Sequence, residues 1–187
     1  RERASTIAAV LVEPVQSRRP DLQPGAFLAV LRTECARRGA ALVFDEMITG
    51  FRIAAGGAQA HFGVRADIVT YGKILGGGMP IGAIAGTRRF LDALDGGTWR
   101  YGDESGPHVA TTFFAGTYNK HPLTMTAARA VLGHLVEAGP ALYDRLNATA
   151  AALEARLAPT LNRAGLGIAR FGSLFRFTHG GNADAFF

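Results

Sequence analysis

Two short apolar runs with a helical segment between them constrain the fold of this chain most strongly. Residues 7–12 and 40–44 are continuous apolar runs, which are typical of strands buried on both faces of a sheet. Between them, Pro24 and Gly25 begin a segment with apolar residues at helical spacing, and Gly39 ends it. Strand, helix and strand in this order predict a βαβ unit and therefore a parallel sheet with a right-handed crossover.

The rest of the chain extends this sheet and adds helices. A third strand is predicted at residues 68–71, and the glycine-rich turn that follows predicts that residues 81–85 pair with it antiparallel. The other expected elements are a loop with short helical pieces at 49–63, a short helix at 88–94, a polar loop at 96–107, two helices separated at Gly139 and Pro140, and a strand at 169–178. The pattern predicts an α/β fold with a mixed, mostly parallel sheet and flanking helices.

Composition excludes several other classes of protein. The 187 residues are 48% hydrophobic and 19% charged, which excludes intrinsic disorder, and no apolar run approaches the roughly 18 residues of a membrane span. The net charge of +5 comes from dispersed basic residues, so we expect neither nucleic-acid nor membrane binding. The single cysteine, Cys35, is interpreted as a core residue. It fits a reducing compartment, and with no visible targeting signal we expect a cytoplasmic location. The five histidines lack metal-ligand spacing, so no metal is predicted.

The scarcity of lysine draws attention to Lys73. Only Lys73 and Lys120 are lysines among 20 basic residues, and the other 18 are arginines. A lysine can lose its proton and act as a nucleophilic amine, whereas an arginine cannot near neutral pH. Lys73 also follows a predicted strand, at the edge of an open α/β sheet where ligands bind.

Asp45 stands at the same edge, directly after the run 40–44. An amine and a carboxylate facing one crevice are the minimum for a pyridoxal phosphate site, where the lysine forms a Schiff base and the carboxylate holds the pyridine nitrogen protonated. Position alone leaves two other interpretations open. Asp45 can cap the next turn, and Lys73 can be a solvated surface charge.

Four ordered segments resemble the class III aminotransferases, and within them the glutamate-1-semialdehyde aminomutase branch. They are residues 12–15 (VEPV), 44–52 (FDEMITGFR), 72–82 (GKILGGGMPIG) and 116–117 (GT). The resemblance implies a fold-type-I, pyridoxal 5'-phosphate-dependent transferase. It also implies that residues 1–160 are the C-terminal part of the cofactor-binding large domain and 161–187 the start of a small C-terminal domain.

The same resemblance implies roles for individual residues. Lys73 would form the Schiff base and move the proton, Asp45 would hold the ring nitrogen, and Met47 would lie against a ring face or simply pack in the core. Thr117 would bind the phosphate of a partner subunit's cofactor, which implies a homodimer, or would cap the following helix. Glu13 is expected near the cofactor without an assigned role.

Arg52 is left with two equal interpretations: it orients a substrate carboxylate, or it braces the loop after the strand. The family's upstream phosphate loop and stacking aromatic are not found, and its C-terminal arginine is not reached. We therefore expect an excerpt of a longer polypeptide that is inactive alone.

A narrower resemblance concerns the aminotransferase domains of hybrid polyketide–peptide synthases. It is carried by residues 14–20 (PVQSRRP), 101–103 (YGD), 112–117 (TFFAGT), 120–123 (KHPL) and 172–177 (GSLFRF). It implies amino-group transfer from a donor to a carbonyl acceptor, with a keto-acyl chain on an acyl carrier domain as one such acceptor. Three alternatives remain: an internal amino shift as in the aminomutases, a non-enzymatic structural remnant, and a nucleotide-binding α/β domain, for which no phosphate loop is present.

Overall fold

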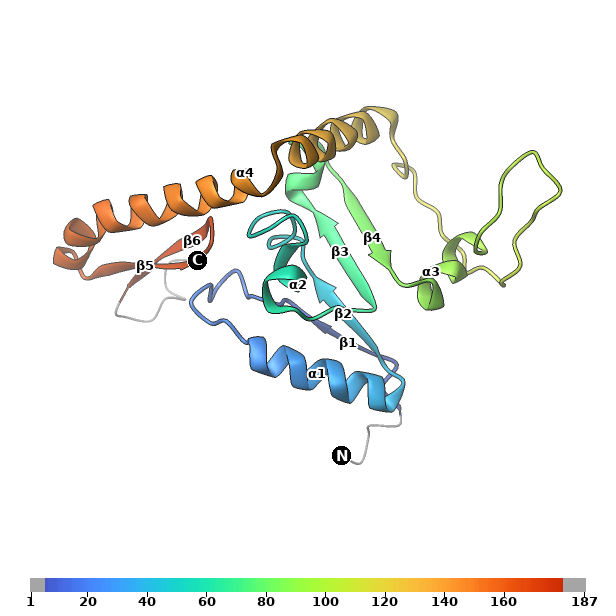
Figure 1. Ribbon diagram of the computed structural model, residues 1–187, viewed down its shortest axis with the longest axis horizontal. Helices are drawn as coiled ribbons and strands as arrows, with labels where there is room; N and C mark the ends of the chain where they lie inside the picture. Colours follow the sequence, from blue (N-terminus) through green and yellow to red (C-terminus); the bar gives the residue numbers. More distant parts are fainter. Residues whose placement is uncertain (1–5, 180–187) are drawn as a thin grey trace.

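The computed structural model describes residues 6–179 and contains a four-stranded sheet, a separate two-stranded sheet and the helices around them (Figure 1). The elements in chain order are β1 (Ala9–Val12), α1 (Gly25–Arg38), β2 (Ala41–Asp45), α2 (Gly57–Phe62), β3 (Ile68–Gly72), the 3-10 helix η2 (Lys73–Gly76), β4 (Gly82–Gly86), α3 (Arg88–Asp95), α4 (Pro122–Arg163), β5 (Leu166–Phe171) and β6 (Leu174–His179). No helix within residues 6–179 is long and apolar enough to cross a membrane.

The larger sheet has the order β1-β2-β3-β4. The pairs β1–β2 and β2–β3 are parallel, and β3–β4 is antiparallel, which confirms the predicted βαβ unit and the predicted antiparallel return. Helix α1 ends at Gly39, which adopts the left-handed φ of 70° that glycine accepts without strain. Because β2 and β3 are parallel, their carboxyl ends meet at one edge of the sheet.

The core lies between α1 and one face of the sheet. Leu28 and Cys35 of α1 pack with Leu42 and Phe44 of β2 and with Val69 of β3. Burying a leucine or phenylalanine side chain of this kind contributes about 1.5–3 kcal/mol each. The burial of Cys35 confirms its interpretation as a core residue.

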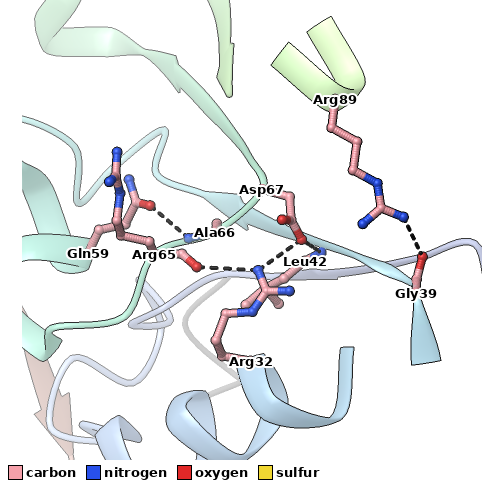
Figure 2. A network of polar contacts seen from close by, with 8 residues as sticks. All are labelled: Arg32, Gly39, Leu42, Gln59, Arg65, Ala66, Asp67 and Arg89. Carbon is pink, nitrogen blue, oxygen red and sulfur yellow. Dashed lines mark hydrogen bonds and ion pairs between the residues drawn. The ribbon is translucent and has the colours of Figure 1, made fainter. Parts of the chain in front are cut away.

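A polar network joins α1, β2 and β3 at the end of the sheet where these strands begin (Figure 2). Oδ2 of Asp67 accepts hydrogen bonds from the Leu42 backbone N–H and from Nη1 of Arg32, both at 2.8 Å. The Asp67 N–H in turn donates to the Leu42 carbonyl at 2.8 Å. Arg32 also donates to the Arg65 carbonyl at 3.4 Å. The network fixes the amino ends of the strands, and the carboxyl ends carry the pocket described below.

Helix α4 consists of two helical segments that meet at Gly139, where φ is 61° and ψ is −162°. This break confirms the predicted separation at Gly139 and Pro140. The first segment contacts η2, where Val131 lies against Gly77, and α4 also contacts β5. Figure 1 shows the hairpin of β5 and β6 lying along the second segment.

Two strand predictions are wrong in detail. The first strand is not buried on both faces: β1 pairs only with β2 in the described sheet, and Leu11 is 66% exposed. The single strand expected at 169–178 is two antiparallel strands, because Gly172 turns the chain with a φ of 58°. The division into domains at residue 160 stays a prediction.

Candidate active site

A pocket of about 220 Å³ opens at the carboxyl ends of β2 and β3. The residues that line it are Glu13, Val15, Asp45, Met47, Ile48, Thr49 and Lys73. The structure therefore brings together four of the five site residues predicted from the sequence, although 60 positions separate Glu13 from Lys73. Pockets that enclose a whole small ligand usually measure roughly 300–1,000 Å³. This one has the size of part of such a site.

Asp45 presents its carboxylate on the sheet face opposite the core. It is the last residue of β2, and successive strand side chains alternate, so Asp45 points away from the core that Phe44 enters. Oδ1 of Asp45 accepts two hydrogen bonds, from the Met47 N–H at 3.0 Å and from the Thr70 hydroxyl at 3.2 Å. Oδ2 accepts none from the residues described. One carboxylate oxygen is held by the protein, and the other is available to a ligand.

Lys73 enters the pocket from a strained backbone position. It directly follows β3, begins η2 and has a φ of 45°, in the left-handed region that non-glycine residues rarely occupy. Such a conformation costs on the order of 1–3 kcal/mol and occurs preferentially at functional sites. The tight turn is what directs this side chain into the pocket instead of continuing the strand.

Met47 both lines the pocket and packs against the backbone beside Lys73. A Cβ at Gly72 would overlap with Sδ and Cε of Met47 and with the Ile81 carbonyl oxygen. Glycine before Lys73 therefore permits Met47 to cover the end of β3. The two interpretations of Met47, ring neighbour and packing residue, are compatible in this geometry.

Glu13 lies at the junction of two cavities. It lines the pocket with Lys73 and also a second cavity of about 410 Å³ beside β1, together with Gln16 and Arg18. Its Oε2 accepts a hydrogen bond from the Ser17 N–H at 3.0 Å, which fixes the carboxylate to the turn after β1.

Sequence reasoning missed Glu46, which holds the loop that lines the pocket. Its side chain is 1% exposed, and its carboxylate accepts hydrogen bonds from the N–H groups of Ala58 and Gln59 at the start of α2 and from the Thr49 hydroxyl. The start of α2 approaches so closely that a Cβ at Gly57 would overlap with the carboxylate. The available signal was the acidic residue directly after Asp45, but its two backbone partners, Ala58 and Gln59, lie 12 and 13 positions further along the chain.

We expect stability to depend on pH through Glu46, because burial raises the pKa of its carboxyl above the ordinary value. Because the pKa is raised in the folded state, the contribution of Glu46 to stability is fully present below the unfolded pKa of about 4.3. That contribution is lost as the pH rises through the folded pKa. The free energy of unfolding of wild type minus that of Glu46→Gln should therefore decrease between pH 4 and pH 7. Urea unfolding of both proteins at several pH values measures this difference.

Glu104→Gln is the control, because it makes the same change of carboxyl to amide at an exposed position. A difference between wild type and Glu46→Gln that stays constant over this pH range would contradict the raised pKa of Glu46.

Two other predicted residues lie outside the pocket. Thr117 is exposed in the segment before α4, and the N-cap of α4 is His121 without a side-chain cap, so Thr117 does not cap that helix. Arg52 is half-buried, and its Nε donates to the Ile48 carbonyl at 2.9 Å. This contact favours the bracing interpretation of Arg52 over contact with a substrate.

Comparison with known proteins places the chain among enzymes of one family. The model of the family "Aminotransferase class-III" matches residues 1–173. A glutamate-1-semialdehyde 2,1-aminomutase of Pyrobaculum aerophilum is 40% identical over 183 residues, which are 95% of this chain and 39% of that protein. The corresponding enzyme of Alkaliphilus oremlandii is 44% identical over 142 residues, 75% of this chain and 30% of that protein. This chain thus spans 30% to 39% of the length of these two relatives.

Solved structures agree with these matches. An omega-transaminase from Sphaerobacter thermophilus superimposes with a TM-score of 0.80 and 32% identity, over 97% of this chain and 39% of that one. A beta-phenylalanine aminotransferase from Variovorax paradoxus gives a TM-score of 0.75 and 33% identity, over 97% and 40% of the two chains.

Proposed function

Because this chain belongs to the class III aminotransferases, we propose that its pocket binds pyridoxal 5'-phosphate and serves the transfer of an amino group to a carbonyl substrate. The observation that carries the proposal is that Lys73 and Asp45 line one pocket at the carboxyl edge of the sheet. The fold is that of the fold-type-I transferases with which it superimposes.

The chemistry of the pocket fits this cofactor. Lys73 offers an amine for an aldehyde, and Asp45 offers a carboxylate oxygen that accepts no hydrogen bond from the described residues. Val15, Met47 and Ile48 supply the apolar surface that a flat aromatic ring needs on its faces. Bound pyridoxal phosphate supplies the aldehyde and a ring that takes up electron density from the carbon next to the amine.

Each residue of this chain has a distinct task in the proposal. Lys73 would hold the cofactor through Nζ and, when that amine is free, would carry a proton from substrate carbon to the cofactor or back. Asp45 would hold the ring nitrogen protonated, and Met47 would supply apolar surface beside the ring. Glu13 lies between this pocket and the second cavity, where Arg18 offers a cation.

We propose that Thr117 serves the phosphate of a second copy of the chain. Thr117 does not line the pocket of its own chain and is exposed. The aromatic side chains around it are exposed as well: Phe113 by 91%, Phe114 by 58% and Tyr118 by 83%. Three exposed aromatic residues this close together in the chain support an interaction surface here, and in our proposal a two-fold dimer buries them and brings Thr117 to the partner's site.

An internal amino shift is the second candidate function, because the relatives described above are named as 2,1-aminomutases. The two solved structures described above are named as a transaminase and an aminotransferase, whereas another similar structure is named as a glutamate-1-semialdehyde aminomutase. Both reactions use the same lysine and carboxylate. A keto-acyl chain on a carrier domain remains our proposal for the acceptor, on the resemblance of residues 14–20 and 112–117 to synthase domains.

A two-substrate assay of the full-length protein with pyridoxal phosphate distinguishes these reactions. We expect an amino acid donor labelled with nitrogen-15 to lose its amino group while a separate keto acid or carrier-bound ketone gains the label in equal amount. Isomerisation of glutamate 1-semialdehyde without any donor would favour the aminomutase. Failure to bind the cofactor would contradict both.

A further inference from the structure

The hydroxyl of Thr70 contacts the Asp45 carboxylate, although Thr70 is not among the residues that line the pocket. Thr70 stands opposite Asp45 in the parallel register of β2 and β3. Its hydroxyl donates to Oδ1 of Asp45 at 3.2 Å in a partly buried position. Thr70 itself does not line the pocket, so any effect on a ligand there must pass through Asp45.

Two donors converge on the same oxygen of this carboxylate. The second is the Met47 N–H, at 3.0 Å from Oδ1. The last torsion of an aspartate side chain is broad and does not by itself fix the plane of the carboxylate. Two hydrogen bonds to Oδ1 from different directions, one from the neighbouring strand and one from the following turn, restrict that torsion and leave Oδ2 for the pocket.

The hydroxyl of Thr70 is not needed to hold the strands together. The Thr70 carbonyl already accepts a hydrogen bond from the Glu46 N–H at 3.0 Å, and the ladder pairs Val43, Phe44 and Asp45 with Ile68, Val69 and Thr70. A valine at position 70 has nearly the same shape and the same preference for strands. Replacing the threonine by valine therefore removes one hydrogen bond and little else.

We propose that Thr70 is a positioning residue that orients Asp45 so that Oδ2 faces the ring nitrogen of the bound cofactor. The proposal rests on the function proposed above for Asp45 and adds a residue outside the pocket to the site. Thr70 neither binds substrate nor moves a proton. It determines which carboxylate oxygen the ligand meets and how rigidly that oxygen is held.

Three variants of the full-length protein test this proposal. In Thr70→Val the hydroxyl is lost, in Thr70→Ser it is kept, and Thr33→Val makes the same change on α1, where the hydroxyl donates only to the Ala29 carbonyl. The measurements are the absorption spectrum and dissociation constant of bound pyridoxal phosphate, kcat and KM for the amino donor, and the melting temperature.

Loss of a hydrogen bond to a charged group is expected to change a rate or a binding constant by about tenfold to a hundredfold. We expect Thr70→Val to lower kcat by this factor with KM for the donor unchanged, to weaken cofactor binding and to alter the cofactor spectrum. Thr70→Ser should restore these properties, and Thr33→Val should equal wild type.

Wild-type values of kcat and an unchanged spectrum in Thr70→Val would overturn the proposal. A loss in Thr70→Val that Thr70→Ser does not restore, or that follows the melting temperature, would overturn it in favour of a purely structural role. If wild type itself fails to bind the cofactor, the proposed function fails and this inference with it, which is a distinguishable result.

Discussion

Replacing Lys73 with arginine in the full-length protein should remove covalent attachment of pyridoxal phosphate and lower amino transfer by at least about 10²–10⁴-fold. Arginine keeps the positive charge and the length of the side chain. It does not lose its proton near neutral pH, so it can neither attach to an aldehyde nor accept a proton from substrate carbon. The expected loss therefore reports on the amine and not on the charge.

The chain provides a closely matched control in Lys120. It is the second lysine, it is exposed, and it also has a left-handed backbone, with a φ of 57°. Borohydride makes a lysine–cofactor attachment permanent, so reduction followed by peptide mapping locates the modified residue. Wild type and Lys120→Arg should carry the cofactor on Lys73, and Lys73→Arg should carry none.

Two results would contradict the assignment of Lys73. One is a modified Lys120 in wild type, which would make Lys73 an ordinary surface charge. The other is a Lys73→Arg protein that transfers amino groups at the wild-type rate. Wild-type protein that binds no cofactor would instead contradict the proposed function as a whole.

The sheet could be predicted because its local signals and its packing agree. Apolar runs at β2 and β3 coincide with buried residues such as Leu42, Phe44 and Val69. Glycines mark the ends of helices, as at Gly39 and Gly139, since their positive φ is accessible to few other residues. These signals depend on a few neighbouring residues and are visible in a single sequence.

Exposure of β1 and the hairpin of β5 and β6 could not be predicted in the same way. An apolar run indicates a strand, but whether its faces are covered depends on neighbouring strands, and β1 has only β2 beside it in the described sheet. Gly172 turns the chain within residues 169–178, whose sequence pattern predicts a single strand. Its turn is specified by tertiary contacts as well, because a Cβ at Gly172 would overlap with Ile53 and Asn147.

The site likewise contains residues that local sequence patterns predict and residues whose roles depend on distant partners. Asp45 and Lys73 follow predicted strands, so their meeting at one edge follows from parallel topology alone. Glu46 and Thr70 were not predicted as contributors. Their importance lies in partners from other elements, the start of α2 for Glu46 and the end of β2 for Thr70. A sequence does not specify such pairings before the fold is known.

Changing Asp45 to asparagine should lower the rate of amino transfer by about 10²–10³-fold while Lys73 still becomes modified by the cofactor. Asparagine has the same shape, and its Oδ1 can still accept from the Met47 N–H and the Thr70 hydroxyl. What disappears is the negative charge at the second oxygen, which we propose keeps the ring nitrogen protonated. The expected loss is therefore electrostatic, with little change in the geometry of the pocket.

Borohydride labelling and steady-state rates on the same preparations separate attachment from turnover. Asp45→Asn should label at Lys73 to the wild-type extent and turn over slowly, whereas Lys73→Arg should fail in both. Asp144→Asn is the matched control, because Asp144 is exposed on α4, far along the chain from the pocket-lining residues. Near-normal turnover of Asp45→Asn would refute the proposed pairing with the ring nitrogen. Loss of labelling in Asp45→Asn would show that this carboxylate is needed to bind the cofactor at all. It would likewise refute a role confined to keeping the ring nitrogen protonated.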